Sequence, residues 1–246
     1  RTRLYIRGLM AEKVNKPLYL VAGLFLFPAA CAMALSLFDA IVSSAGVMGG
    51  FTAESVALLG GIVAFSLCWA SLPLSARTYV FAHEMTHAVW ALLFGAKISS
   101  FSVRKDSGHV MLSKSNMLIT LAPYFFPFYT FVVIVVALVT YAFLRPLPYM
   151  PFWYFLIGFT WAFHVLYTVS TLSTRQPDIM LYGRLFSWVF IFVVNVLIIL
   201  VWIAAMTQLT FKDLFSICLG RQADVYQFVW RGISSVCKLC VGKGVG

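Results

Sequence analysis

The chain has 246 residues, of which 62% are hydrophobic and only 11% charged, and its formal net charge is +10. Soluble domains typically have about 25% charged residues, so the composition excludes an ordinary soluble protein. The Lys and Arg residues lie mostly at the ends of apolar segments, where anionic lipid headgroups attract them. We expect no nucleic acid among the partners, because no basic helix interleaved with aromatic residues occurs in a soluble segment.

Several uncharged, mostly apolar runs are long enough to cross a lipid bilayer as helices, which takes about 20 residues. They cover residues 18–38, 55–76, 115–144, 146–174 and 185–211. A β-barrel would show short alternating segments instead. We therefore predict an all-α, polytopic membrane protein in contact with the lipid bilayer.

The first part of the chain predicts one membrane crossing. Residues 1–17 are rich in Lys and Arg, which predicts a cytoplasmic N-terminus. A helix is expected over residues 18–38. Residues 39–54 contain Asp39 and Glu54 but no Lys or Arg, and they include several Ser and Gly residues. We expect them to form a loop on the opposite side of the membrane.

Two further helices are expected after this loop. One covers residues 55–73, because Pro73 should kink or end it. The next covers residues 75–94 and stops at Gly95, a residue type that often follows a helix C-terminus. If this second helix crosses the membrane fully, the chain has six transmembrane helices, and if it dips in and returns, the chain has five. The positive-inside rule favours five, although it then places the basic C-terminal tail outside.

The pattern changes over residues 96–115. The apolar residues there fall in short, partly alternating stretches around the sequence KDSGH: Ile98, Phe101, Val103, Val110 and Leu112. This pattern predicts a small β-hairpin with its turn near residues 106–108, inserted after the preceding helix. Because open sheet edges are not tolerated in lipid, the hairpin must lie at the membrane interface or inside a protein cavity.

The remaining helices are expected over residues 117–143, 150–170 and 185–208. The last of them follows the linker STRQPDIMLYGR. Residues 1–210 are thus expected to form a single integral membrane domain, and residues 211–246 a basic C-terminal tail of uncertain structure.

The sequence HEMTH, residues 83–87, is the strongest chemical signal. The chain has four His and three Glu, and three of these seven lie within these five positions of an apolar segment. Because residues i and i+4 of a helix point to the same face, His83 and His87 can bind one zinc ion. Glu84 can act as general base on a water that the zinc activates. Ionisable groups in such a segment are costly and are functional by default, which argues against a chance match.

A catalytic zinc usually has three protein ligands and an open position. No Glu follows Glu84, and residues 88–97 contain no His, so two common ligand patterns are excluded. The remaining candidates are His109, His164, Asp106, Asp178, Asp213 and Asp224. Asp178 is the preferred third ligand because it is the only acidic residue in a long apolar stretch, and its alternative role is a charge at a helix N-terminus. His164 is the alternative ligand, a group that supports the ligands, or a buried core histidine.

The stretch HEMTHAVWALLFGAKISSFSV, together with RQPDIMLYG, resembles the site-2 protease family of intramembrane zinc metalloproteases. That family has HExxH on a membrane helix, then a Gly, a short β segment, and an Asp ligand on a later membrane helix. The resemblance covers residues 75–190. The chain departs from the family pattern because Pro177 directly precedes Asp178, in place of an Asn-Pro-rich run ending in Asp-Gly, and because no PDZ-like insert is present. It resembles a compact, divergent member.

This resemblance implies an enzyme that holds one zinc ion per chain on His83, His87 and Asp178, with Glu84 as the general base. Its substrate would be a transmembrane segment of another protein, locally unwound and cleaved at a peptide bond.

Two features point to substrate binding in such an enzyme. The hairpin edge at Ile98, Phe101 and Val103 could hold an extended substrate as an added strand. Asn116 is a candidate for polarising the scissile carbonyl, with a helix N-cap as its alternative role.

Other functions use the same residues. A membrane zinc hydrolase could act on a lipid, a prenylated molecule or a peptide near the interface. A non-catalytic protein, either a metal transporter or an inactive relative, is the third possibility. A transporter is expected to show polar residues on several helices, and an inactive zinc-binding protein would not need Glu84.

Overall fold

The computed structural model describes residues 5–6, 15–47, 52–73, 75–104, 107–207 and 209–242. Most of these residues are helical. The chain divides into two compact units, and the described residues of Arg1–Lys16 and Gly50–Gly183 form the first. Those of Pro17–Gly49 and Arg184–Gly246 form the second. The predicted domain boundary at residue 210 stays a prediction.

Four helices in the described residues are long and apolar enough to cross a membrane. They are α1 (Lys16–Val47), α2 (Ala53–Ser71), α6 (Met150–Leu172) and α8 (Arg184–Met206). A bent pair, Met117–Tyr124 with Phe128–Phe143, makes a fifth if both parts belong to one span. The HEMTH helix is not among them. These helices are compatible with a multi-pass membrane protein, and the number of crossings and their direction stay predictions.

In the second unit, α1 is longer than expected. We predicted a loop from Asp39 onward, but α1 continues to Val47, so that prediction was wrong. The carboxylate of Asp39 accepts hydrogen bonds from Nε and Nη2 of Arg221. This ion pair compensates the only acidic side chain in an apolar helix, so the charge does not end the helix.

The C-terminal tail is helical over α9 (Phe211–Gly242). At its start, Asp213 Oδ2 accepts a hydrogen bond from the Thr210 N–H at 2.9 Å, while the Asp213 N–H donates to Thr210 Oγ1 at 3.2 Å. Hydrogen bonds from the Thr210 hydroxyl and N–H lower the pKa of Asp213. This reciprocal cap fixes the first turn of the helix, and the buried Leu214 packs against residues of α1 and α8.

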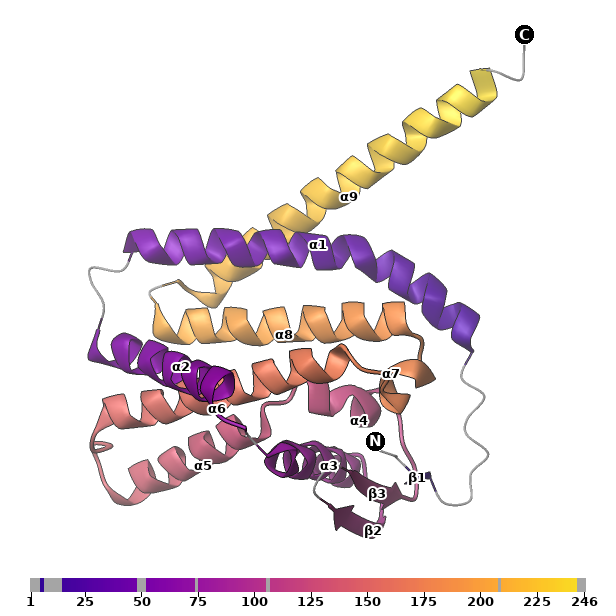
Figure 1. Ribbon diagram of the computed structural model, residues 1–246. Helices are drawn as coiled ribbons and strands as arrows, with labels where there is room; N and C mark the ends of the chain where they lie inside the picture. The colour runs from indigo at the N-terminus through magenta and orange to yellow at the C-terminus, as the bar shows by residue number, and fades with distance from the viewer. Residues whose placement is uncertain are drawn as a thin grey trace. The chain divides into compact units, whose positions relative to one another are not determined.

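In the first unit, α2 and α6 lie side by side (Figure 1). A Cβ atom placed on Gly61 would lie 2.1 Å from the carbonyl oxygen of Phe155, and one on Gly158 would lie 2.1 Å from that of Leu58. The two backbones are therefore in direct contact at these glycines. Small residues allow this close packing between membrane helices.

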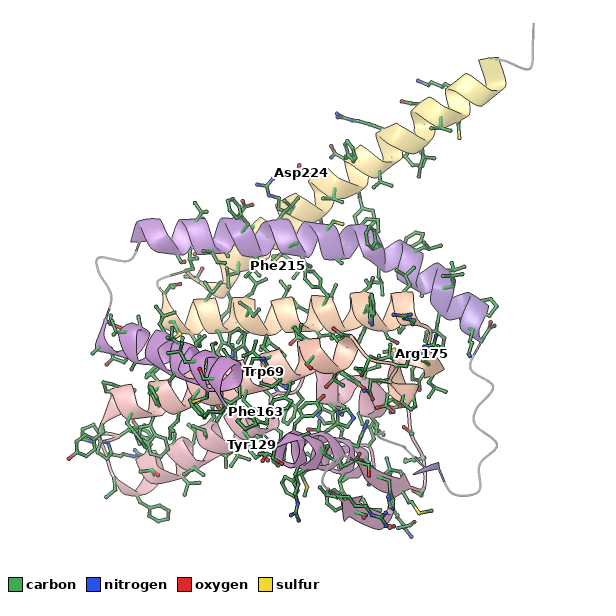
Figure 2. The ribbon with its side chains drawn as sticks, viewed as in Figure 1. Trp69, Tyr129, Phe163, Arg175, Phe215 and Asp224 are labelled. Carbon is green, nitrogen blue, oxygen red and sulfur yellow. The ribbon has the colours of Figure 1, made fainter. Side chains whose placement is uncertain are left out.

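Aromatic side chains join α6 to its neighbours. Figure 2 shows Trp69, Phe163 and Tyr129, which come from α2, α6 and α5 (Phe128–Phe143). The ring of Phe163 lies 5.4 Å from those of both Tyr129 and Phe65 on α2. These contacts fix α6, which carries His164, between α2 and α5.

The single helix predicted over residues 117–143 is wrong. The chain forms α4 (Met117–Leu121), a 3₁₀ turn η1 (Ala122–Tyr124) and then α5, and the two parts are bent by 85°. Pro123 and Pro127 stand at the break, where neither can donate a backbone hydrogen bond. The break leaves the side chain of Tyr124 fully buried.

The predicted hairpin is confirmed. Strands β2 (Ile98–Val103) and β3 (Gly108–Leu112) pair antiparallel, and part of their turn lies outside the described residues. An additional short strand, β1 (Tyr5–Ile6), pairs parallel with β3. The strand order is β1-β3-β2, so β2 is an edge strand. Residues of β3 pack against α3 (Ala76–Leu93) in a cluster that includes Ala88, Ala91, Val110 and Leu112.

The signals that were expected to end the helices act as predicted. α2 ends two residues before Pro73, and Gly95 follows α3 with a φ of +67°, which favours glycine. Asp178 lies in the first turn of a separate short helix, α7 (Pro177–Leu181). Gly183, with a φ of +86°, separates it from α8.

We expect Gly61→Ala to destabilise the first unit, because the added Cβ would collide with the Phe155 carbonyl. Overpacking of this kind costs roughly 1–3 kcal/mol, or roughly 2–12 °C in the unfolding midpoint of a chain this size. Gly60→Ala is the matched control, because its Cβ would meet only Phe155 Cδ2 at 3.9 Å. Equal midpoints for both variants in a thermal unfolding assay of the purified protein would contradict the close packing.

Candidate metal centre

One turn of α3 carries the three ionisable residues of the motif. His83 is 2% exposed, and Glu84 and His87 are fully buried. The two histidines point to one side of the helix, toward α7 and α4, and Glu84 points toward β3. This division follows from helical geometry, in which i and i+4 share a face and i+1 does not.

The structure brings Asp178 of α7 to both histidines. Oδ2 of Asp178 lies 3.4 Å from His83 Nε2 and 3.6 Å from His87 Nε2. Both distances are long for hydrogen bonds, which are usually 2.7–3.2 Å. Two ligands of a tetrahedral zinc ion, each about 2.1 Å from the metal, are separated by roughly 3.4 Å. The ligand atoms all lie within 4.8 Å of one another, so this buried group could hold a metal ion.

Hydrogen bonds at the other ring nitrogens orient the two imidazoles. His87 Nδ1 lies 2.8 Å from the carbonyl oxygen of Ile119, and His83 Nδ1 lies 3.4 Å from the hydroxyl of Tyr79. Because a carbonyl only accepts, His87 must carry a proton on Nδ1, which leaves Nε2 as a lone-pair donor. That Nε2 has no hydrogen-bond partner among the described residues. A histidine held in this way is typical of metal ligands.

Asp178 is also held from outside the group. The hydroxyl of Tyr124 donates a hydrogen bond to Asp178 Oδ2 at 3.2 Å. The ring of Tyr124 lies edge-on to His83, with 5.3 Å between the ring centroids. The turn between α4 and α5 therefore supports the same carboxylate oxygen that faces the two histidines.

Among the ionisable side chains of this site, Glu84 has the fewest partners that could offset the burial of its charge. It is fully buried, and neither carboxylate oxygen has a hydrogen-bond partner among the described residues. A Cβ atom on Gly108 would lie 2.5 Å from Glu84 Cγ, so only glycine lets β3 pass this close. A buried carboxylate without a partner is costly. Together with the free Nε2 of His87, it indicates that the residues fit a divalent cation.

His164, the alternative ligand, is not part of this group. It is buried on α6, and its Nε2 has no hydrogen-bond partner within the described part of the chain. It lines a small cavity, about 10 Å³ in volume, whose wall also includes His83, Thr86 and Tyr129. A cavity of that size holds about one water molecule. The structure thus groups Asp178, and not His164, with the two histidines.

The residues predicted to bind substrate lie around the hairpin. Asn116 Oδ1 accepts a hydrogen bond from the Ile119 N–H at 2.9 Å, which is the geometry of a helix N-cap. Its role toward a substrate stays a prediction. On β2, Ile98 and Phe101 are exposed and Val103 is partly buried.

The other acids and histidine considered as ligands either lie apart from the ligand group in the described residues or lie outside those residues. His109 pairs with Ser102 in the hairpin. Asp213 caps α9, and Asp224 lies 3.8 Å from Arg221. Asp106 is outside the described residues.

The sequence did not point to Tyr79, Tyr124, Gly108 or the Ile119 carbonyl. Tyr79 had a usable signal, because it lies four residues before His83 on the same helical face. Pro123 and Pro127, on either side of Tyr124, were a usable signal for a helix break that the predicted helix over residues 117–143 did not take into account. Gly108 and the Ile119 carbonyl depend on contacts between distant segments.

No family model, curated protein or solved structure matches this chain. The resemblance to site-2 proteases stays a prediction that rests on the motif and on Asp178. The arrangement of His83, His87 and Asp178 stands on the geometry alone.

We expect purified protein to contain about one metal ion per chain, because two imidazoles and one carboxylate are the kind of three-ligand set that holds a catalytic zinc ion. Asp178→Ala should lose the metal, since it removes one of three donors, while His164→Ala should keep it. Metal analysis after purification without chelators distinguishes the two. Metal retained in Asp178→Ala and lost in His164→Ala would contradict the ligand group.

Tyr124→Phe should weaken the affinity for added Zn²⁺ by about 10–100-fold, the usual effect of removing a group that orients a ligand. Tyr129→Phe is a suitable control, because its hydroxyl donates to the Thr78 carbonyl at 2.9 Å and not to Asp178. Competition with a zinc-binding dye measures both affinities. Equal affinities would show that Tyr124 does not orient Asp178.

Proposed function

We propose that this protein is an intramembrane zinc metalloprotease, similar to the site-2 proteases, that hydrolyses a peptide bond in or near a transmembrane segment of another protein. The main support is the fully buried, unpartnered carboxylate of Glu84 beside the group of His83, His87 and Asp178. A metal-binding protein without catalysis needs three ligands but not a fourth buried acid. An enzyme that hydrolyses an amide needs a base there.

His83, His87 and Asp178 would hold one zinc ion, and two neutral imidazoles with one carboxylate leave it a net positive charge. Zinc bound in this way supplies a Lewis acid that lowers the pKa of a water molecule and polarises a carbonyl group. Ile119 and Tyr124 keep the His87 and Asp178 side chains in position through the hydrogen bonds described above. These contacts limit the movement of the site during turnover.

Glu84 would move the proton. Its carboxylate would accept a proton from the attacking water as the new C–O bond forms, and would then pass that proton to the nitrogen of the leaving amine as the C–N bond breaks. Because it makes no hydrogen bond with the described residues, its oxygens are available for this transfer. Gly108 keeps the β3 backbone beside Glu84, which limits access of bulk water on that side.

The edge strand β2 favours a peptide as the substrate. In an antiparallel ladder, residues alternate between pointing their N–H groups toward and away from the partner strand. Arg104 N–H donates to Ser107 O at 2.7 Å, so the N–H groups of Val103 and Phe101 point to the open edge of β2. An extended peptide can bind there as a further strand. A lipid substrate would make no use of these groups.

A transmembrane segment suits such an edge only after it has unwound. A helix uses its carbonyl groups in its own hydrogen bonds, which protects its peptide bonds. The apolar helices of this chain are compatible with a location in the same membrane as such a substrate.

The decisive experiment compares wild-type protein with Glu84→Gln in liposomes that contain single-span reporter proteins. Glu84→Gln keeps the size of the side chain but removes the base, so cleavage should fall by about 10²–10⁴-fold with unchanged zinc content. Mass spectrometry of the fragments gives the cleaved bond. A zinc chelator should stop wild-type cleavage, and added Zn²⁺ should restore it.

The same preparation tests the main alternative. Hydrolysis of lipid or prenylated substrates that depends on Glu84, without cleavage of any reporter protein, would replace the protease by another zinc hydrolase. Zinc bound without any hydrolysis would indicate a non-catalytic protein.

Phe101→Pro should abolish cleavage because it removes an N–H from the open edge, where edge strands tolerate proline. Phe101→Ala is the matched control: it also loses the ring contact with Phe81 but keeps the N–H group. We expect the alanine variant to retain most activity and both variants to retain zinc. Equal cleavage by the two variants would show that substrate does not pair with β2.

A further inference from the structure

A groove between α5 and α6 is not used by the proposed reaction. It has a volume of about 410 Å³, within the range of small-molecule sites. Its lining is almost entirely apolar and comes from both helices and the loop between them: Ile134, Ala137, Leu138, Tyr141, Pro146, Leu147, Met150 and Ile157. Ile157 is buried, whereas Leu138 is 62% exposed, so the groove has a closed floor and an open side.

The groove results from an incomplete contact between the two helices. Ile134, Leu138 and Tyr141 lie on one face of α5 at helical spacing, where a tightly packed neighbour would cover them. Leu138 and Tyr141 remain exposed. Protein interiors and membrane helix contacts are close-packed, so a groove of this size in an apolar helix pair is expected to take up an apolar chain.

A positively charged side chain, that of Arg145, lies at one end of the groove. The guanidinium of Arg145 lies 5.1 Å from the centre of the Tyr141 ring, which is part of the groove wall. Arg145 forms no ion pair with any described residue. Arginine held over an aromatic ring is well suited to bind a phosphate group with its remaining N–H donors.

The loop at this end has the composition of a membrane interface. Tyr149 is exposed, and Trp153 Nε1 donates to the Pro148 carbonyl at 3.2 Å. Tyrosine and tryptophan are enriched at the level of the lipid headgroups. The apolar groove thus starts beside residues typical of the headgroup region.

We propose that this groove binds one anionic phospholipid, with an acyl chain along Ala137 and Leu138 and the phosphate on Arg145. The length of the groove favours a lipid over a protein segment. From Ile134 to Tyr141 the face of α5 spans about 10 Å at 1.5 Å per residue. A transmembrane helix would need a contact surface closer to 30 Å long.

The test is a lipid titration of the purified full chain in detergent, followed by native mass spectrometry. The probes are dioleoylphosphatidylglycerol, dioleoylphosphatidylcholine and soluble glycerol phosphate. Wild-type protein should bind one phosphatidylglycerol more tightly than phosphatidylcholine and should not bind glycerol phosphate. Arg145→Gln should weaken phosphatidylglycerol binding by about tenfold, because it removes a charge-assisted contact.

Two further variants separate the groove from its charge. Ala137→Phe fills the groove while Arg145 stays, and it should weaken the binding of both lipids. Arg231→Gln removes an exposed charge from α9 and should leave lipid binding unchanged. A thermal unfolding measurement without added lipid checks that each variant is folded.

Several results would overturn the proposal. Equal phosphatidylglycerol binding by wild type and Arg145→Gln would show that Arg145 does not bind the lipid phosphate. Equal affinities of the wild type for the two lipids would show the same. Tight binding that persists in Ala137→Phe would place the lipid on the surface and not in the groove. Binding of glycerol phosphate with similar affinity would indicate a free phosphate site.

Discussion

Four ionisable side chains buried within one turn of a helix and its neighbour impose the main constraint on this protein. His83, Glu84, His87 and Asp178 are almost completely removed from solvent in a chain with only 11% charged residues. Burial of two carboxylates without compensation is unfavourable. A divalent cation would compensate both, because three of the side chains could bind it directly and the fourth lies beside them.

The groups around the site are positioned by points at which the backbone departs from a regular helix or strand. The break at Pro123 and Pro127 ends what would be one long helix and places Tyr124 against Asp178. Gly95 ends α3 so that the chain can return as a hairpin, and Gly108 lets that hairpin lie beside Glu84. Each of these points interrupts a regular element, and the interruption brings a group from a distant segment to the site.

The second unit also contains a charged side chain that has a specific partner within an apolar part of the chain. Asp39 lies within α1 and is paired with Arg221 of α9, so an acid in an apolar helix again has a specific partner. Polar groups inside apolar helices are costly unless they are paired. In both units, the ionisable residues that interrupt apolar segments form contacts with segments far away in the sequence.

Short-range patterns predicted much of this structure. The apolar runs predicted the long helices, Pro73 and Gly95 predicted helix ends, and alternation predicted the hairpin. Elimination among the few polar residues favoured Asp178, which the structure places next to His83 and His87.

Long-range contacts could not be predicted in this way. The continuation of α1 past Asp39 depends on Arg221, which is 182 positions away in the sequence. The strand β1 becomes visible only through its pairing with β3. Pro123 and Pro127 are visible in the sequence, but the prediction followed the long apolar run alone and gave a continuous helix. Tyr124 was missed for that reason.

The central claim is that two imidazoles and one carboxylate hold zinc in this chain. Zinc K-edge X-ray absorption of the purified protein tests it most directly, because imidazole rings give a distinct scattering pattern. The account predicts two histidine ligands with zinc–nitrogen distances of about 2.0–2.1 Å, the remaining ligands being oxygen, and no sulfur. A spectrum with sulfur ligands, or one without histidine scattering, would contradict it.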